Sequence, residues 1–183
     1  EEAIERAKQS RANWRQVITS FFSRLQRTRF TYEKPNRRFV HRGIYLPGPK
    51  REQSLVVLVL DSSGSMDSEK ISQCLAEIWA VGQRFPRLQL LILVADYDLQ
   101  YICKHPSEIK VRGRGGTSFV PAFEYVEEHH LQPSGMVYFT DLEGDFPDRA
   151  PRYPVVWAAV KDHKPPFGRV VRIPVGRNDK EKR

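Results

Sequence analysis

The chain has 183 residues, 40% of them hydrophobic and 28% charged, with a formal net charge of +8. This length suits one domain of about 120–150 residues with an appendage, and no apolar run approaches the roughly 20 residues of a membrane span. Residues 1–20 lack the apolar segment of a signal peptide. Two cysteines, Cys74 and Cys103, are too few for a disulfide framework or a zinc cluster. We therefore expect a cytoplasmic protein.

The N-terminal segment, residues 1–51, is predicted to form a basic amphipathic helix followed by a connector. It holds 13 Lys and Arg against 4 Asp and Glu, whereas residues 52–183 hold 17 against 18. Residues 2–28 read as one helix because apolar side chains recur at three- and four-residue spacing. We expect this stripe to be buried, and it comprises Ile4, Ala7, Trp14, Ile18, Phe21 and Leu25. Pro and Gly residues then favour an extended connector.

Residues 52–176 are predicted to form an α/β domain, and residues 177–183 a charged tail. The segments "SLVVLVL", "LQLLILVAD", "GMVYFTD", "YPVVWAAV" and "GRVVRIPV" read as strands, with a shorter strand or hairpin in "LQYICKH" and "EIKVRG". Helices are expected at residues 67–85, with Asp67 as N-cap, and within residues 115–130. Apolar side chains, Trp79 among them, form the predicted buried side of the first helix. The alternation predicts a Rossmann-like, open, mostly parallel sheet with helices on both faces.

Oxygen-bearing side chains gather where these strands end. Asp61 and Asp141 each follow a strand, Ser63 and Ser65 lie in the turn after Asp61, and Thr117 follows a glycine-rich loop. Sites in open parallel sheets form outside the carboxyl ends of the strands. Carboxylate and hydroxyl oxygens suit Mg²⁺ or Mn²⁺. The sequence therefore predicts a metal site at the surface edge of the sheet, with the Asp61 strand in the middle of the sheet.

The order of these residues resembles a known motif. "DSSGS", "GGTSF" and "FTD" resemble the metal-ion-dependent adhesion site (MIDAS) of von Willebrand factor A (vWA) domains, in which Asp-x-Ser-x-Ser is followed by a Thr and then an Asp. The resemblance implies the ligands Asp61, Ser63, Ser65, Thr117 and Asp141. It also implies a protein-interaction module in which the ion binds an Asp or Glu of a protein partner.

A second resemblance covers more of the chain. "PNRRF", "YLPG", "TDLEGDFP", "YPVVW" and "PPFG" resemble the C-terminal vWA-like domain of predicted bacterial metallopeptidases, in which a zinc-peptidase domain comes first. No His-Glu-x-x-His is present, so we expect this chain to be no enzyme. Because the chain does not begin with Met, we expect a piece of a longer protein. Bacterial relatives work beside AAA-type ATPases, which suggests such a partner.

Several alternatives remain open at this stage. A Mg²⁺ at the sheet edge could support phosphoester hydrolysis, and the basic N-terminal segment could bind nucleic acid. The aromatics of that segment lie at buried spacing, which disfavours the second alternative. Asp96 and Asp98 could extend the metal site, although a polar strand end explains them better. His129 and His130 could be ligands, but a cation also suits the end of a helix.

Overall fold

The structure is a computed structural model that describes residues 14, 16–25, 29–31, 37–50, 53–66, 68–109 and 115–173. A six-stranded sheet forms its centre, in the order β5-β4-β3-β6-β7-β8. The strands are β3 (Leu55–Asp61), β4 (Gln89–Ala95), β5 (Leu99–Cys103), β6 (Gly135–Thr140), β7 (Val155–Ala159) and β8 (Arg169–Arg172). Neighbouring strands are parallel except for β4 and β5, which are antiparallel.

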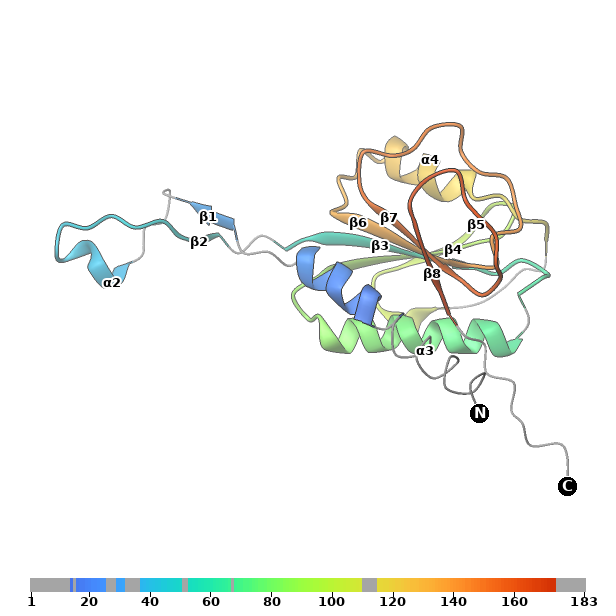
Figure 1. The fold of residues 1–183 in the computed structure, drawn as a ribbon, viewed down its shortest axis with the longest axis horizontal. Coiled ribbons are helices and arrows are strands. Elements are labelled where there is room, and N and C mark those ends of the chain that lie inside the picture. The colour runs from blue at the N-terminus through green and yellow to red at the C-terminus, as the bar shows by residue number, and fades with distance from the viewer. Residues whose placement is uncertain are drawn as a thin grey trace, which may run out of the picture.

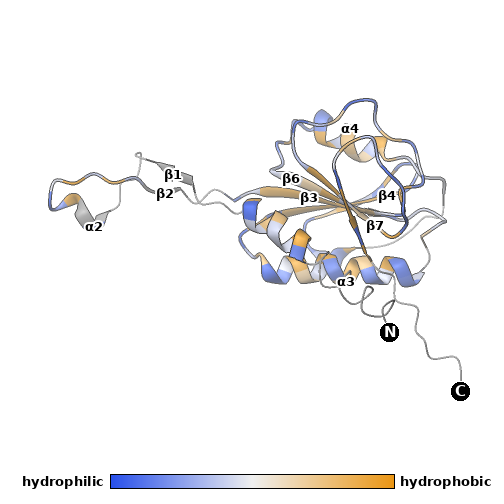
Figure 2. Ribbon diagram, in the orientation of Figure 1, coloured by the Kyte–Doolittle hydropathy of each residue, from blue (hydrophilic) through white to orange (hydrophobic). Residues whose placement is uncertain are grey.

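The predicted α/β architecture is thus confirmed. Strand β3 lies between β4 and β6, as expected for the strand that ends in Asp61. Because β3, β4 and β6 run in the same direction, their carboxyl ends meet at one edge of the sheet. Figure 2 shows apolar residues along these strands, which are covered on both faces.

The two faces of the sheet are packed against different helices. Alternate residues of β3 belong to different apolar clusters: Leu58 and Leu60 join the cluster that contains α3, whereas Val57 and Val59 join the cluster that contains α4. Helix α3 spans Ser68–Arg84 and helix α4 spans Val120–Glu128. Figure 1 shows the two helices on opposite sides of the sheet. This two-sided cover explains why β3 reads as a continuous apolar run.

Helix α3 corrects one detail of the predicted buried side. Cys74, Ile78 and Val81 are buried, but Trp79 is 44% exposed. Successive helical residues are separated by about 100° around the axis, so Trp79 falls beside the stripe that Ile78 occupies. Its ring instead lies edge-on to His105, with ring centroids 5.6 Å apart. The predicted N-cap, Asp67, lies outside the described residues.

A helix over residues 16–25 packs on the same side of the sheet as α3 (Figure 1). Trp14, Ile18 and Phe22 are buried, whereas Phe21 and Leu25 are only partly buried, so the predicted stripe is confirmed in part. Phe21 covers Gly135 at the start of β6, where an added Cβ would lie 2.6 Å from Phe21 Cζ. The rest of the predicted helix, residues 2–13 and 26–28, lies outside the described residues.

The connector contains short elements that the glycine and proline pattern did not predict. Strands β1 (Arg29–Thr31) and β2 (Gly48–Lys50) form an antiparallel pair, and helix α2 spans Arg37–Val40 between them. Figure 1 shows this segment projecting away from the sheet. Apolar side chains exposed on it are Ile44, Tyr45 and Leu46.

The segment between β5 and α4 is only partly described. Strand β5 confirms the strand predicted in "LQYICKH". The first residue of "EIKVRG" ends a short 3-10 helix, η1 (Pro106–Glu108), rather than beginning a strand, and residues 110–113 lie outside the described residues, as do residues 177–183. None of the helices in the described part of the chain has the length and apolar character that a bilayer crossing requires.

Candidate functional site

Asp61 is the last residue of β3, and each oxygen of its carboxylate accepts a hydrogen bond. The Ser63 amide donates to Asp61 Oδ1 at 2.9 Å, and the Thr140 hydroxyl donates to Asp61 Oδ2 at 2.6 Å. Thr140 ends β6 and stands next to Asp61 because Leu60 pairs with Phe139. The sequence pattern did not point to Thr140, although it directly precedes the predicted ligand Asp141.

The turn after Asp61 brings two serine hydroxyls to the same edge. Ser63 Oγ and Ser65 Oγ lie 3.1 Å apart and share a hydrogen bond. The Gly64 amide donates to the Gly115 carbonyl at 3.2 Å, which joins this turn to the glycine-rich loop. The Lys70 ammonium donates to the Ser65 carbonyl at 2.9 Å and anchors the turn to the first part of α3.

Thr117 lies in a loop whose position is fixed by backbone hydrogen bonds. The neighbouring Ser118 amide donates to the Asp96 carbonyl at 2.9 Å, and the Asp145 amide donates to the Thr117 carbonyl at 3.4 Å. Gly144 permits this approach, because an added Cβ would lie 2.8 Å from the Thr117 carbonyl oxygen. Hydrogen bonds thus connect Asp61, Ser63, Ser65 and Asp141 with one another. In the described residues Thr117 is instead held against Asp145 and Gly144, so the structure does not bring it into contact with these four.

Asp141 begins the loop after β6 and faces a cation of the chain itself. The Lys161 ammonium nitrogen lies 3.0 Å from Asp141 Oδ2 and 2.7 Å from Glu143 Oε2. Burial would raise the pKa of Asp141, but Lys161 and the Ser65 hydroxyl hold that pKa below its ordinary value. The same two carboxylates raise the pKa of Lys161 against the opposing effect of desolvation. Asp141 is therefore an anion paired with Lys161.

Asp61 has the opposite electrostatic character. Its burial raises its pKa, and the charge of Asp141 adds to that rise, while hydrogen bonds from Thr140 and Ser63 lower it. The net result is a pKa above the ordinary value. A cation placed between the two carboxylates would favour the ionised form of Asp61.

The burial of this cluster corrects the expectation of a surface site. Asp61 is 1% exposed and Asp141 is 0% exposed, and Ser63 is also buried. Ser65 and Thr117 are partly exposed, so the carboxylates lie below the surface while part of the predicted ligand set reaches it. Removing Asp61 would leave the Ser63 amide and the Thr140 hydroxyl without their acceptor, which costs folding free energy. Removing Asp141 would leave Lys161 with Glu143 alone.

The donor chemistry of the cluster fits Mg²⁺ or Mn²⁺. Two carboxylates and serine hydroxyls supply oxygen ligands, which these hard cations prefer. The oxygen Asp141 Oδ2 is buried, has no hydrogen bond of good geometry among the described residues, and is already approached by one cation, Lys161. In the described residues, no group of three or more carboxylate, imidazole or thiol side chains is placed to hold a metal ion, so an ion here would need the hydroxyls.

The other candidate ligands from the sequence, among them Asp96, His129 and His130, have structural explanations of their own. Asp96 accepts hydrogen bonds from the Asp98 amide at 3.1 Å and the Gln100 side chain at 2.9 Å, which explains it as a polar strand end. His129 is the C-cap of α4, and its ring contacts the Tyr125 carbonyl. His130 follows with a positive φ of 50°.

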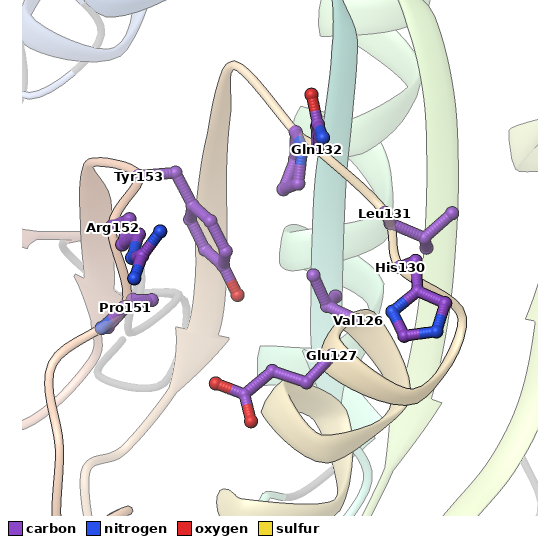
Figure 3. A pocket seen from close by; sticks show the side chains of 9 residues that line it. Val126, Glu127, His130, Leu131, Gln132, Pro151, Arg152 and Tyr153 are labelled. Atoms are coloured by element: carbon purple, nitrogen blue, oxygen red, sulfur yellow. The ribbon is translucent and has the colours of Figure 1, made fainter.

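A hollow of about 610 Å³ lies at the opposite end of the strands from the carboxylate cluster. It is formed between the end of α4 and the segments that lead into β6 and β7, so it lies at the amino ends of these strands. Figure 3 shows the Tyr153 hydroxyl pointing into it from the segment before β7, with Glu127 on the opposite side. This hollow is separate from the carboxylate cluster at the carboxyl ends.

Comparison with known families agrees with this architecture. The family described as VWA-like domain (DUF2201) matches residues 56–174. The chain belongs to this family. The match begins in β3 of this VWA-like domain and includes all five predicted ligands, but it leaves out the helix at residues 16–25. A search of the curated proteins found no match.

Proposed function

We propose that this VWA-like domain binds Mg²⁺ or Mn²⁺ through Asp61, Ser63, Ser65, Thr117 and Asp141, and uses the ion to bind an acidic side chain of a protein partner. The observation that carries the proposal is the pair of buried carboxylates, Asp61 and Asp141, at the ends of adjacent parallel strands with two serine hydroxyls beside them. Buried carboxylates are costly unless cations or hydrogen bonds compensate them. A divalent ion would supply that compensation.

The composition of the ligand set favours binding of a further carboxylate. Only two of the five proposed ligands carry charge, so a divalent ion would not be over-neutralised by the protein. Such an ion attracts an additional anionic ligand. An Asp or Glu from a partner protein offers one, and the ion would then form part of the interface.

The proposal assigns binding rather than catalysis to this chain. Two-metal hydrolysis needs several carboxylates around adjacent ions, and in the described residues no group of three or more carboxylate, imidazole or thiol side chains is placed to hold a metal ion. A preceding peptidase domain and an AAA-type ATPase partner remain predictions that rest on the resemblance alone.

The nucleic-acid alternative loses support from the packing of the N-terminal helix. Stacking on bases requires exposed aromatic faces. Trp14 and Phe22 are buried in the core, and Phe21 is partly buried against Gly135. The side chain of Phe30 lies outside the described residues.

Calorimetric titration of MgCl₂ and MnCl₂ into the full chain tests the metal site. Asp61→Asn retains an acceptor for the Ser63 amide but removes a charged ligand, and we expect it to weaken binding more than the roughly 10–100-fold loss that follows from altering an outer partner. Thr117→Ala should weaken binding less. Asp148→Asn, at an exposed carboxylate outside the proposed ligand set, is the matched control. Equal affinities of wild type and Asp61→Asn would refute the site.

Carboxylate binding is tested with acetate as the probe. Water-proton relaxation by Mn²⁺ on the protein should fall as acetate displaces ion-bound water. The Asp61→Asn variant should show no such change at the same Mn²⁺ concentration. If acetate leaves the relaxation of the wild type unchanged, then the proposed role of the ion in partner binding is wrong.

A further inference from the structure

The cation beside Asp141 comes from a position that the vWA-type motif does not contain. Lys161 follows β7, which ends at Ala159. Its ammonium nitrogen contacts Asp141 Oδ2 at 3.0 Å and Glu143 Oε2 at 2.7 Å. The Lys161 side chain is 36% exposed, that of Glu143 is 46% exposed, and that of Asp141 is 0% exposed. Lys161 thus connects one buried and one exposed carboxylate.

This arrangement leaves two cations to compete for one carboxylate. A buried, ionised Asp141 needs a compensating positive charge, and Lys161 supplies it in this structure. A divalent ion held by Asp61 and Asp141 would come close to the ammonium group and repel it. The ion pair between Asp141 and Lys161 and the coordination of the ion by Asp141 therefore weaken each other.

We propose that Lys161 is an internal competitor for the divalent ion: its ammonium group neutralises Asp141 in the metal-free protein and moves onto Glu143 alone when the ion binds. This inference rests on the proposed function. Lys161 accordingly lowers the affinity of the site for the ion, because binding must first break the contact between Lys161 and Asp141.

The loop after β6 provides the second position for the ammonium group. Leu142, between the two carboxylates, has a φ of 65°, and its amide donates to Thr140 Oγ1 at 3.0 Å. The Glu143 amide donates to Asp141 Oδ1 at 3.2 Å. These contacts fix a tight turn that presents Asp141 and Glu143 to the same ammonium group. Only a small displacement of a flexible, partly exposed lysine is needed to leave one carboxylate and keep the other.

The test is calorimetric titration of MgCl₂ and MnCl₂ into the full chain and its variants. Lys161→Met and Lys161→Gln remove the charge, and Gln keeps a hydrogen-bond donor for Asp141 if Met prevents folding. Both should bind the ion about fivefold more tightly, the change expected for one partly exposed ion pair. Lys161→Arg should stay within about twofold of wild type. Lys164→Met, at an exposed lysine nearby, controls for net charge.

A double-mutant cycle tests the transfer to Glu143. Glu143→Gln removes the second position of the ammonium group and also one negative charge near the ion. If transfer occurs, then Glu143→Gln weakens ion binding more in the presence of Lys161 than in the Lys161→Gln background. Equal effects in the two backgrounds would show that Glu143 acts only by its charge and would overturn the transfer.

The outcomes separate this inference from the proposed function. Wild type that binds the ion no more weakly than Lys161→Met and Lys161→Gln would overturn the competition and leave the metal site in place. Failure of wild type and of every Lys161 variant to bind either ion would overturn the metal site itself, and the competition with it. Thermal unfolding gives an independent readout: relative to samples in EDTA, samples in MgCl₂ without EDTA should show a larger rise in melting temperature for Lys161→Gln than for wild type.

Discussion

Replacing Thr140 with Val tests how the cluster is held together. The Thr140 hydroxyl is buried, donates to Asp61 Oδ2 at 2.6 Å and accepts from the Leu142 amide at 3.0 Å. Valine has nearly the same shape, so Thr140→Val removes these two hydrogen bonds without opening a cavity. The variant leaves both a buried carboxylate oxygen and a buried amide without their partner.

The expected cost follows from these two contacts. A hydrogen bond to a charged group contributes about 1.5–3 kcal/mol, and an unsatisfied buried donor costs about 1–3 kcal/mol. Because the contacts share one hydroxyl and relaxation recovers part of the loss, we expect Thr140→Val to lower the free energy of unfolding by about 2–4 kcal/mol. Thr140→Ser keeps the hydroxyl and loses one methyl group, which should cost about 1 kcal/mol.

Urea denaturation of wild type and both variants, without metal and at neutral pH, provides the measurement. The decisive comparison is the order of the variants rather than either value alone. If Thr140→Ser is as destabilised as Thr140→Val, then the methyl group rather than the hydroxyl stabilises this position. The account of Asp61 as a carboxylate oriented by Thr140 would then be wrong.

Three further predictions concern the core, the loop and acid stability. Phe22→Ala should cost about 3–5 kcal/mol in urea denaturation because Phe22 is 0% exposed; the exposed Ser23→Ala is its control, and a cost below about 1 kcal/mol would show that the helix is not part of the core. Gly144→Ala should weaken Mn²⁺ binding in calorimetry, because its Cβ would lie 2.8 Å from the Thr117 carbonyl; unchanged affinity would show that Thr117 tolerates displacement. The pKa of Asp96 lies below its ordinary 3.8, since hydrogen bonds from the Asp98 amide and Gln100 outweigh the effect of burial. Asp96 therefore stabilises the fold above that pH and loses this contribution as the pH falls through its folded pKa. Urea denaturation should show Asp96→Asn less stable than wild type at pH 7, with the difference shrinking below about pH 4; a constant difference would contradict the assignment.

The sequence predicted the architecture well because the strands carry two independent signals. Continuous apolar runs indicated strands covered on both faces, and Asp61 and Asp141 marked where two of them end. Parallel order then required these ends to meet at one edge. The burial of the two carboxylates was not predictable, because it depends on residues distant in sequence, such as Thr140 beside Asp61 and Lys161 beside Asp141.

Helix packing was predicted only approximately, since periodicity fixes a face but not its centre. Phe21 and Phe22 are adjacent, and the sequence does not say that Gly135 leaves room for the first while the core encloses the second. Trp79 was wrongly predicted to be buried for a related reason: the spacing of apolar residues does not separate the buried stripe from a large apolar residue beside it. Its exposure is visible only once the partner surface is known.

Lys161 was missed because motif reasoning considers ligands of a metal and not competing cations. A lysine after the seventh strand has no local pattern that links it to Asp141. Its placement depends on β6 and β7 being parallel neighbours, so that the residues following each strand come together at one edge. Such contacts follow from topology and become predictable only after the strand order is known.

The strand order also decides when the cluster can form during folding. Asp61 and Thr140 touch across a separation of 79 residues, and β3 must pair with β6 before that contact exists. Contacts of this range form slowly, because a long loop must close first. A chain emerging from the ribosome completes β3 and β4 well before β6 is available. An ion at this edge would therefore stabilise the finished sheet but would take no part in starting its assembly.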